Sequence, residues 1–288
     1  MMNRIFTTCA AVLFLFVLVP FSGLAQSKTT LNIATFNLRL NVASDKENAW
    51  PNRKEMVKEL IQYHDFDIFG VQEALEGQMK DLSALSEYSH VGVGRDDGKA
   101  GGEFSAIFYK NKKYRILNSG TFWLSPTPEK PSKGWDAAYI RICTWAKFKD
   151  IASGKVFFMF NTHFDNEGVL ARENASKMIL AKIKAISDAK SPVFITGDFN
   201  SDPKTSAYGT IVKVFADAKL VSKAAPYGPE QTFNDFKYHT YTTEVKEGRI
   251  DFVFVNKNVQ VLKYAVLTDS RDLRFPSDHF PVVCRVRF

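Results

Sequence analysis

Cysteine is scarce in this sequence, with three residues among 288. Cys9 precedes the N-terminal apolar run rather than following it, so no cysteine is placed for the lipid attachment that anchors a lipoprotein. Cys143 and Cys284 both lie in apolar, strand-like runs, where buried free thiols are common. An exported protein would also allow the two to pair. We therefore favour free thiols, with a disulfide as the open alternative.

Long uncharged apolar runs are absent after the N-terminal region, which argues against a membrane-spanning helix there. At the N-terminus, Arg4 supplies positive charge, residues 10–19 are all apolar, and Gly23-Leu24-Ala25 offers small residues for cleavage. This order is typical of a secretory signal peptide, and the apolar run is too short to span a bilayer comfortably. We predict a signal peptide over residues 1–25 and no stable membrane insertion. Residues 26–288 would then be periplasmic or secreted; a retained N-terminal anchor is the alternative.

No Gly- and Ser-rich linker and no internal repeat divides residues 26–288, which predicts a single domain. With 45% hydrophobic residues, the chain can build a large core, and disorder is not expected. The net charge of +7 suits a phosphate-bearing partner, but the lysines are scattered and form no dense basic run. A solvated lysine-rich surface therefore explains the charge equally well. Nothing in the sequence indicates a protein partner.

Apolar periodicity predicts both helices and strands. Helical spacing occurs after Pro51, around Met79 and Leu82, and over residues 169–186 and 207–215. Strand-like runs occupy residues 31–36, 67–72, 105–109, 139–148, 156–160, 193–196, 250–255, 259–267 and 282–286. This content predicts one α+β domain with two packed sheets. The Pro- and Trp-containing loop over residues 127–135 is predicted to be exposed and to face a substrate.

Polar side chains cluster where the apolar strands begin or end. Because the ends of neighbouring strands lie close together, such clusters can converge on one site. Five clusters follow this rule: Asn37, Gln72-Glu73, Asn161-Thr162-His163, Asp198 with Asn200, and Asp278-His279. Asp251 lies inside an apolar strand, where a carboxylate would be an awkward buried charge unless it is paired. The sequence therefore predicts one polar site at a sheet edge.

The residue types in these clusters indicate a chemistry. They supply many hard oxygen ligands and no thiolate, which favours Mg²⁺ or Mn²⁺, with Ca²⁺ also compatible. No Ser-His-Asp or Cys-His arrangement marks a nucleophile, so water is the expected attacker. Hydrolysis of a phosphate ester fits both features. A histidine beside a carboxylate could be protonated, to stabilise the transition-state charge, or neutral, to accept a proton; both states stay open at this point.

Six motifs together resemble the endonuclease/exonuclease/phosphatase superfamily, which has the deoxyribonuclease I-like fold. They are Thr35-Phe36-Asn37, Gln72-Glu73, Asn161-Thr162-His163, Gly197-Asp198-Phe199-Asn200, Arg249-Ile250-Asp251 and Ser277-Asp278-His279, in the family's order. The resemblance implies a four-layer α/β/β/α sandwich of two mixed β-sheets flanked by helices. Within the superfamily, the sequence is similar to a branch of exported bacterial proteins and, more distantly, to deadenylase and nocturnin-like enzymes.

The resemblance also implies roles for individual residues. Glu73 resembles the principal metal ligand, with Asn37 beside it and Asp278 as a further ligand or metal-water contact. Asp198 resembles the residue that aligns or activates the attacking water, and Asn200 its companion at the scissile phosphate or at a second metal.

The histidines of the motifs resemble the pair that flanks the phosphate in this superfamily. They are His163 and His279, and Asp251 resembles the carboxylate that orients His279. Arg141 lies in the strand before His163, where some nucleases of the family place a phosphate-contacting arginine. The implied substrate is a phosphate ester: a nucleic acid, a nucleotide, or a sugar or lipid head-group phosphate.

Each motif taken alone also has a structural explanation. Asn37 fits a turn, Glu73 fits the N-terminal turn of a helix, and Asp198 with Asn200 fits an Asx turn before Pro203. The ordered set favours a functional site over these explanations. Outside the motifs, we predict structural or surface roles for His64, His90 and His239 and aromatic packing for Trp123 and Trp135, while Glu103 and Arg172 are candidates to reach the site.

Two other functions stay open at the level of sequence. One is a non-catalytic module that keeps the fold in order to bind phosphorylated ligands, which would not require a water-activating carboxylate and histidine. The other is a metal-dependent hydrolase of a non-phosphate ester. Turnover of phosphate esters with and without a chelator separates the first alternative from an enzyme.

Overall fold

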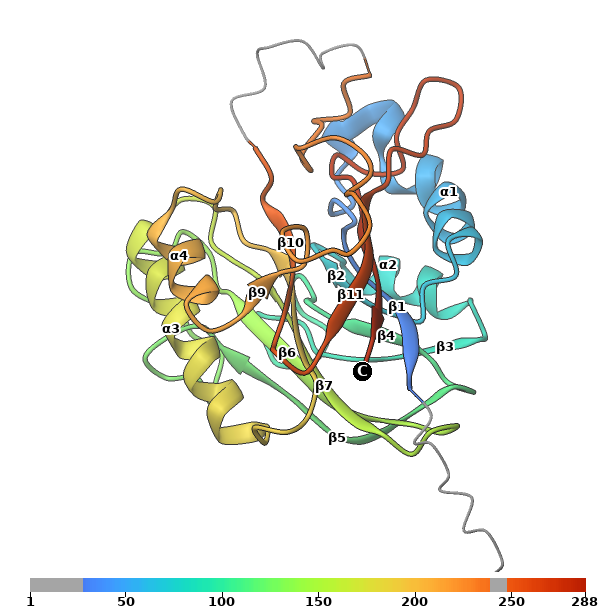
Figure 1. The fold of residues 1–288 in the computed structure, drawn as a ribbon. Coiled ribbons are helices and arrows are strands. Elements are labelled where there is room, and N and C mark those ends of the chain that lie inside the picture. Colours follow the sequence, from blue (N-terminus) through green and yellow to red (C-terminus); the bar gives the residue numbers. More distant parts are fainter. Residues whose placement is uncertain (1–27, 239–247) are drawn as a thin grey trace, which may run out of the picture.

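Two six-stranded β-sheets pack face to face in the computed structural model, which describes residues 28–238 and 248–288. Helices α1 and α2 lie against the outer face of one sheet, and α3 and α4 against the outer face of the other (Figure 1). The result is the predicted α/β/β/α sandwich. The predicted signal peptide and His239 lie outside the described residues.

The first sheet contains both ends of the described chain. Its order is β11 (Gln260–Val266), β12 (Val282–Arg287), β1 (Thr30–Asn37), β2 (Ile68–Gln72), β4 (Ile107–Lys110) and β3 (Tyr88–Val91). Only β1 and β2 are parallel neighbours in it. The 3₁₀ helix η1 (Ala43–Asn48) and helix α1 (Trp50–Tyr63) connect these two strands, and α2 (Glu76–Ser83) follows β2.

The second sheet has the same plan. Its order is β5 (Tyr114–Trp123), β6 (Ile142–Asp150), β7 (Val156–His163), β8 (Val193–Asp198), β10 (Asp251–Val255) and β9 (Ala216–Asp217). Its parallel pair is β7 with β8, connected by helix α3 (Val169–Ile186), and α4 (Ser206–Val212) follows β8. Each sheet therefore has one parallel pair whose carboxyl ends lie at the same edge.

Three apolar clusters fill the three spaces between the four layers. Strand β7 contributes side chains to two of these clusters. Phe157 and Met159 pack between the sheets, whereas Phe158 and Phe160 pack under α3 and α4. Successive side chains of a strand point to opposite faces, so an unbroken apolar run fits a strand that is covered on both sides.

A buried polar side chain bridges the two sheets. The Asn161 side chain of β7 donates to the carbonyl oxygens of Val71 and Ala106, at 2.9 and 3.0 Å. Its Oδ1 accepts from Gln72 Nε2 at 2.8 Å. Gly70 leaves the space for it, because a Cβ there would lie 2.1 Å from Asn161 Oδ1. Asn161 and Gln72, both members of the motifs, therefore align the sheets, since buried amides must be hydrogen-bonded.

Most predicted elements are confirmed, and α3 has the predicted bounds. The strand predicted over residues 139–148 begins only at Ile142, which pairs with Trp123, the last residue of β5; before it, the backbone N–H groups of Ala138 and Tyr139 donate to the Asp165 carboxylate instead of to a strand. The sequence pattern missed η1, β3, β5 and β9. Cys143 and Cys284 are buried free thiols in different apolar clusters. Among the described residues, no helix combines the length and hydrophobicity that crossing a bilayer requires.

Candidate active site

The polar clusters predicted from the sequence meet at one edge of the two sheets. Asn37 and His163 end β1 and β7, and Asp198 ends β8. The register pairs Asp198 with His163 on one side and with Asp251 on the other. These strand ends open into a cavity of about 500 Å³. The members of the motifs that line it are Glu73, His163, Asp198, Asn200, Ile250, Asp278 and His279.

His279 is held by a buried carboxylate. Its Nδ1 lies 2.8 Å from Asp251 Oδ2, and its Nε2 lies 3.8 Å from Asp198 Oδ2. Burial by itself lowers the pKa of the imidazole, but the Asp251 and Asp198 carboxylates outweigh it and hold the pKa of His279 well above its usual value. The ring is therefore an imidazolium at neutral pH, and Asp251 is paired as a buried charge must be.

His163 is in the opposite charge state. Burial lowers the pKa of its imidazole to about 3, and the nearby Arg141 adds to the effect. Its Nε2 lies 3.1 Å from Asn200 Nδ2 and accepts that N–H, which leaves the proton on Nδ1. The sequence left open whether such a histidine is neutral or protonated. In the structure, His163 is neutral and His279 is protonated.

Asp198 lies between the two histidines. Its Oδ2 is 3.6 Å from His163 Nε2 and accepts a hydrogen bond of 2.9 Å from Asn37 Nδ2. Burial raises the pKa of Asp198, and the Asp251 carboxylate adds to the shift. A carboxylate with a raised pKa is a better proton acceptor than an exposed one.

Glu73 and Asn200 have strained backbones. Both are non-glycine residues with positive φ, 62° for Glu73 and 43° for Asn200. Asn37 Nδ2 donates to Glu73 Oε1 at 3.0 Å, and the Leu40 N–H donates to Glu73 Oε2 at 3.1 Å. Left-handed backbone at such residues costs on the order of 1–3 kcal/mol and persists where the surroundings impose it, as they do here around the carboxylate.

The donor set fits a divalent cation. Ligand atoms of Glu73, His163 and Asp198 lie within 4.8 Å of one another. Those of Asp198, Asp251 and His279 are equally close, but the His279 imidazolium is paired with Asp251 and has no lone pair to offer a metal. The predicted set of Asn37, Glu73 and Asp278 is adjacent, but the Asn37 amide directs its nitrogen to Glu73 and Asp198, while its oxygen accepts from Arg39 N–H. Glu73 and Asp278 are therefore the oxygen donors of that set that face the cavity.

Asp278 is buried near the Glu73 carboxylate, and its Oδ2 lies 3.8 Å from Arg39 Nε. Burial raises the pKa of its carboxyl to about 6, and the Glu73 charge adds to the shift against the opposing effect of His279. Because the folded-state pKa exceeds the ordinary value of 3.8, the folded protein binds this proton more tightly than the unfolded chain. The contribution of Asp278 to stability is therefore favourable below about pH 4 and is lost as the pH rises through 6.

Replacing Asp278 by asparagine, which resembles the protonated carboxyl, is expected to stabilise the protein in EDTA at pH 7 by about 1–3 kcal/mol. The gain should disappear near pH 4. Chemical denaturation of both proteins at the two pH values measures it, with exposed Glu129→Gln as the control. A D278N variant less stable than the wild type at pH 7 would contradict the explanation that burial of the charged carboxylate raises the pKa of Asp278.

Three arginines line the cavity, and the sequence predicted one of them. Arg141 was predicted, and it lines the cavity with a guanidinium held by Asp165 and Asn166. Arg39 and Arg95 line it as well and were missed. Arg39 is two residues beyond Asn37, a proximity that could have revealed it. Arg95 lies in a Gly- and Asp-rich loop without apolar periodicity, so no sequence pattern placed it.

Other expectations about the cavity had mixed outcomes. Glu103 reaches it, 3.7 Å from His163 Nδ1, whereas Arg172 donates to the Asp165 carbonyl and does not line it. The loop over residues 127–135 contributes none of the lining residues, contrary to the prediction that it faces the substrate; Tyr139 lines the cavity instead. Trp123 is buried and donates to the Arg95 carbonyl, in agreement with a packing role.

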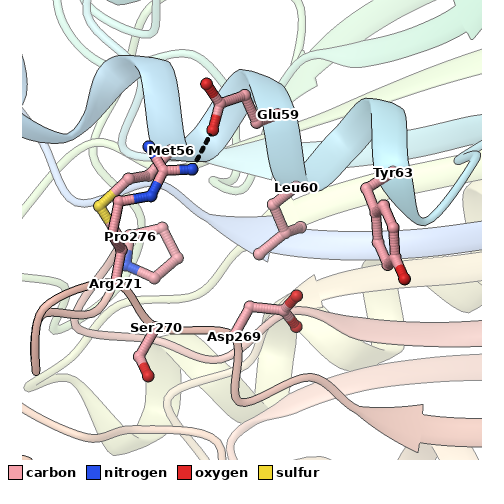
Figure 2. Close-up of a pocket in the computed structure, with 8 residues that line it drawn as sticks. All are labelled: Met56, Glu59, Leu60, Tyr63, Asp269, Ser270, Arg271 and Pro276. Carbon is pink, nitrogen blue, oxygen red and sulfur yellow. Dashed lines mark hydrogen bonds and ion pairs between the residues drawn. The ribbon is translucent and has the colours of Figure 1, made fainter.

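A second cavity of about 240 Å³ lies between α1 and the segment 269–276 (Figure 2). Its apolar wall comes from Leu60, Met56 and Pro276, and an ion pair joins Arg271 to Glu59 across its rim. It shares no lining residue with the cavity at the strand ends and gathers no histidine or carboxylate cluster. We therefore place the chemistry at the strand ends.

Comparison with known proteins identifies the same family that the six motifs resemble. The model of the endonuclease/exonuclease/phosphatase family matches residues 34–279. A mannosyl-6-phosphatase from Bacteroides thetaiotaomicron is 42% identical, with a TM-score of 0.85 over 90% of this chain and 100% of that one. A second structure from the same organism, described as an endonuclease/exonuclease/phosphatase family protein, is 41% identical, with a TM-score of 0.86 over 91% and 99% of the two chains.

The human Nocturnin catalytic domain shares the fold at 19% identity, with a TM-score of 0.69 over 91% of this chain and 96% of that one. The match of the family model covers all six motifs that the structure brings together or aligns around the cavity. The chain therefore belongs to the endonuclease/exonuclease/phosphatase family of phosphate-ester hydrolases.

Proposed function

We propose that this protein is a Mg²⁺- or Mn²⁺-dependent phosphomonoesterase that acts on sugar phosphates by direct attack of water. The observation that carries the catalytic part is the position of Asp198, a buried carboxylate of raised pKa between a neutral and a protonated histidine. The substrate class is supported by the 42% identity to a mannosyl-6-phosphatase over 90% of this chain.

The reaction follows from the groups that surround the cavity. Asp198 accepts a proton from water as the oxygen attacks phosphorus, and Asn37 holds the carboxylate in place. The bond between phosphorus and the sugar oxygen breaks, and the leaving oxygen takes a proton from the medium. The His279 imidazolium lies beside Asp198 and stabilises the charge that develops on the phosphoryl oxygens.

Asn200 and His163 form the other side of the phosphate position. Asn200 Nδ2 is held by the Phe164 carbonyl and by His163, which fixes the amide at the cavity wall. A divalent cation bound by Glu73 and Asp278 would neutralise negative charge on the phosphate and stabilise the leaving oxygen. No side chain in this arrangement requires a covalent enzyme intermediate.

Phosphate release from a panel of esters tests the proposal. We expect turnover of mannose 6-phosphate, glucose 6-phosphate and p-nitrophenyl phosphate in Mg²⁺ or Mn²⁺. Slower turnover is expected with bis(p-nitrophenyl) phosphate and single-stranded RNA. Activity confined to the diesters would overturn the phosphomonoesterase assignment, and tight binding of the sugar phosphates without turnover would favour the non-catalytic binding module.

A further inference from the structure

Two guanidinium groups meet at one carboxylate on the wall of the cavity. Arg95 Nη1 lies 2.7 Å from Glu103 Oε2, and Arg141 Nη1 lies 3.9 Å from the same oxygen. The Arg95 and Arg141 side chains are 12% and 6% exposed, so both charges are largely removed from bulk water. His163 Nδ1 is 3.7 Å from that oxygen as well, which places the two arginines next to the neutral histidine.

The half-exposed ring of Tyr139 contacts both guanidinium groups. The guanidinium carbons of Arg95 and Arg141 lie 5.5 and 5.6 Å from the centroid of its ring. Such contacts stabilise a cation against an aromatic face. The backbone of Tyr139 is held by its N–H, which donates to the Asp165 carboxylate at 3.0 Å. The pair is therefore preorganised before any ligand arrives.

Among the described residues, two buried donors of the pair have no hydrogen-bond acceptor. Arg95 Nε and Arg141 Nη1 are buried without a hydrogen-bond partner; the carboxylate oxygens beside them, Asp96 Oδ1 and Glu103 Oε2, lie 3.8 and 3.9 Å away, too far for a hydrogen bond. The nearest carboxylate, Glu103, is shared by both arginines, and Asp165, the other acid beside Arg141, also accepts from the backbone N–H groups of Ala138, Tyr139 and Gly168. Buried cationic donors that lack partners are costly unless an anion completes them.

We propose that Arg95 adds a second guanidinium to the phosphate contact that the family resemblance implies for Arg141, and that Arg95 is the specificity-determining residue that makes the site prefer monoesters to diesters. A monoester phosphate carries nearly two negative charges and three free oxygens, whereas a diester carries one charge and two. A second guanidinium therefore stabilises a bound monoester more than a bound diester, because the monoester has an additional charged oxygen. This inference rests on the proposed function and names the residue behind its substrate class.

The test compares Arg95→Gln with the wild type on p-nitrophenyl phosphate and on bis(p-nitrophenyl) phosphate. We expect kcat/KM for the monoester to fall about 10- to 100-fold, in line with a lost charge-assisted hydrogen bond. The loss for the diester should be smaller, so that the ratio of monoester to diester activity falls at least about tenfold. Arg95→Lys should recover part of the ratio, because it restores the charge but not the planar fork.

Arg271→Gln is the matched control, since it removes an arginine that also lines a cavity, the one in Figure 2. It should leave the ratio unchanged. Equal losses on both esters in R95Q would overturn the inference, because they would show a general structural role for Arg95. Thermal unfolding of R95Q and R95K identifies any loss of fold, and the R95K protein keeps the test usable if R95Q unfolds.

Binding of inorganic phosphate, measured by calorimetry, separates this inference from the proposed function. We expect the dissociation constant to rise about tenfold or more in R95Q and to stay unchanged in R271Q. If the wild type hydrolyses no monoester but shows this dependence on Arg95, the phosphatase proposal fails and the Arg95 contact with phosphate stands. If phosphate affinity does not depend on Arg95, that contact is refuted even in an active phosphatase.

Discussion

Replacing Asp198 by asparagine is expected to lower kcat for phosphate-ester hydrolysis by about a thousandfold. The amide keeps the shape of the side chain and can still bond to the Asn200 N–H, which Asp198 Oδ1 accepts at 2.9 Å. It cannot accept a proton from water. Because substrate binding depends on other groups of the cavity, KM should change far less than kcat.

Asp202→Asn is the control for this substitution. Asp202 lies four residues along the same loop, and within the described part of the chain its carboxylate accepts one hydrogen bond, from the local Lys204 N–H at 2.6 Å. We expect its kcat to stay within a factor of two of the wild type. Steady-state kinetics on one monoester measures both variants. A D198N enzyme that keeps near-wild-type kcat would remove Asp198 from the role of water-activating group.

Removal of divalent metal is expected to lower activity by at least about a thousandfold, because the buried carboxylates of the site would face the phosphate uncompensated. Dialysis against EDTA and readdition of Mg²⁺ or Mn²⁺ measures this loss and its recovery. Glu73→Gln should raise the metal concentration for half-maximal activity by at least about tenfold, since it removes a charged oxygen ligand.

Glu76→Gln provides the comparison, three residues from Glu73. Its carboxylate pairs with Lys80 on the exposed side of α2, and the side chain is 52% exposed. Its metal dependence should match the wild type. Full activity in EDTA, or an unchanged metal requirement in E73Q, would refute a cation at this position.

The predicted site residues come together because of a regularity that a sequence can show. Asn37, His163 and Asp198 each end an apolar strand, and parallel neighbours end at the same sheet edge. Strand ends are visible as the point where an apolar run turns polar. Residues in loops have no such marker, which is why Arg95 was missed and why the loop over residues 127–135 was placed at the cavity in error.

Membership of a motif also does not separate a chemical role from a structural one. Asn161 and His163 are two residues apart and therefore lie on the same face of β7, the face that is turned toward the first sheet. Asn161 turns toward the first sheet and bridges it, while His163 turns toward the cavity with Asn200. Position along the strand separates them: Asn161 lies inside β7 between the packed sheets, whereas His163 is its last residue, where the space between the sheets opens into the cavity.

Short stretches of sequence were enough to predict the order of elements, their apolar faces and the residue types of the site, because each depends on neighbours within a few positions. The charge states of His163 and His279 were decided only by the tertiary structure. Both rings are buried, but only His279 has a paired carboxylate at 2.8 Å, from Asp251, which is 28 residues away in sequence. A pKa depends on burial and on charges brought together from distant parts of the chain. The contact of Arg95 and Arg141 with one carboxylate likewise joins residues that are distant in sequence.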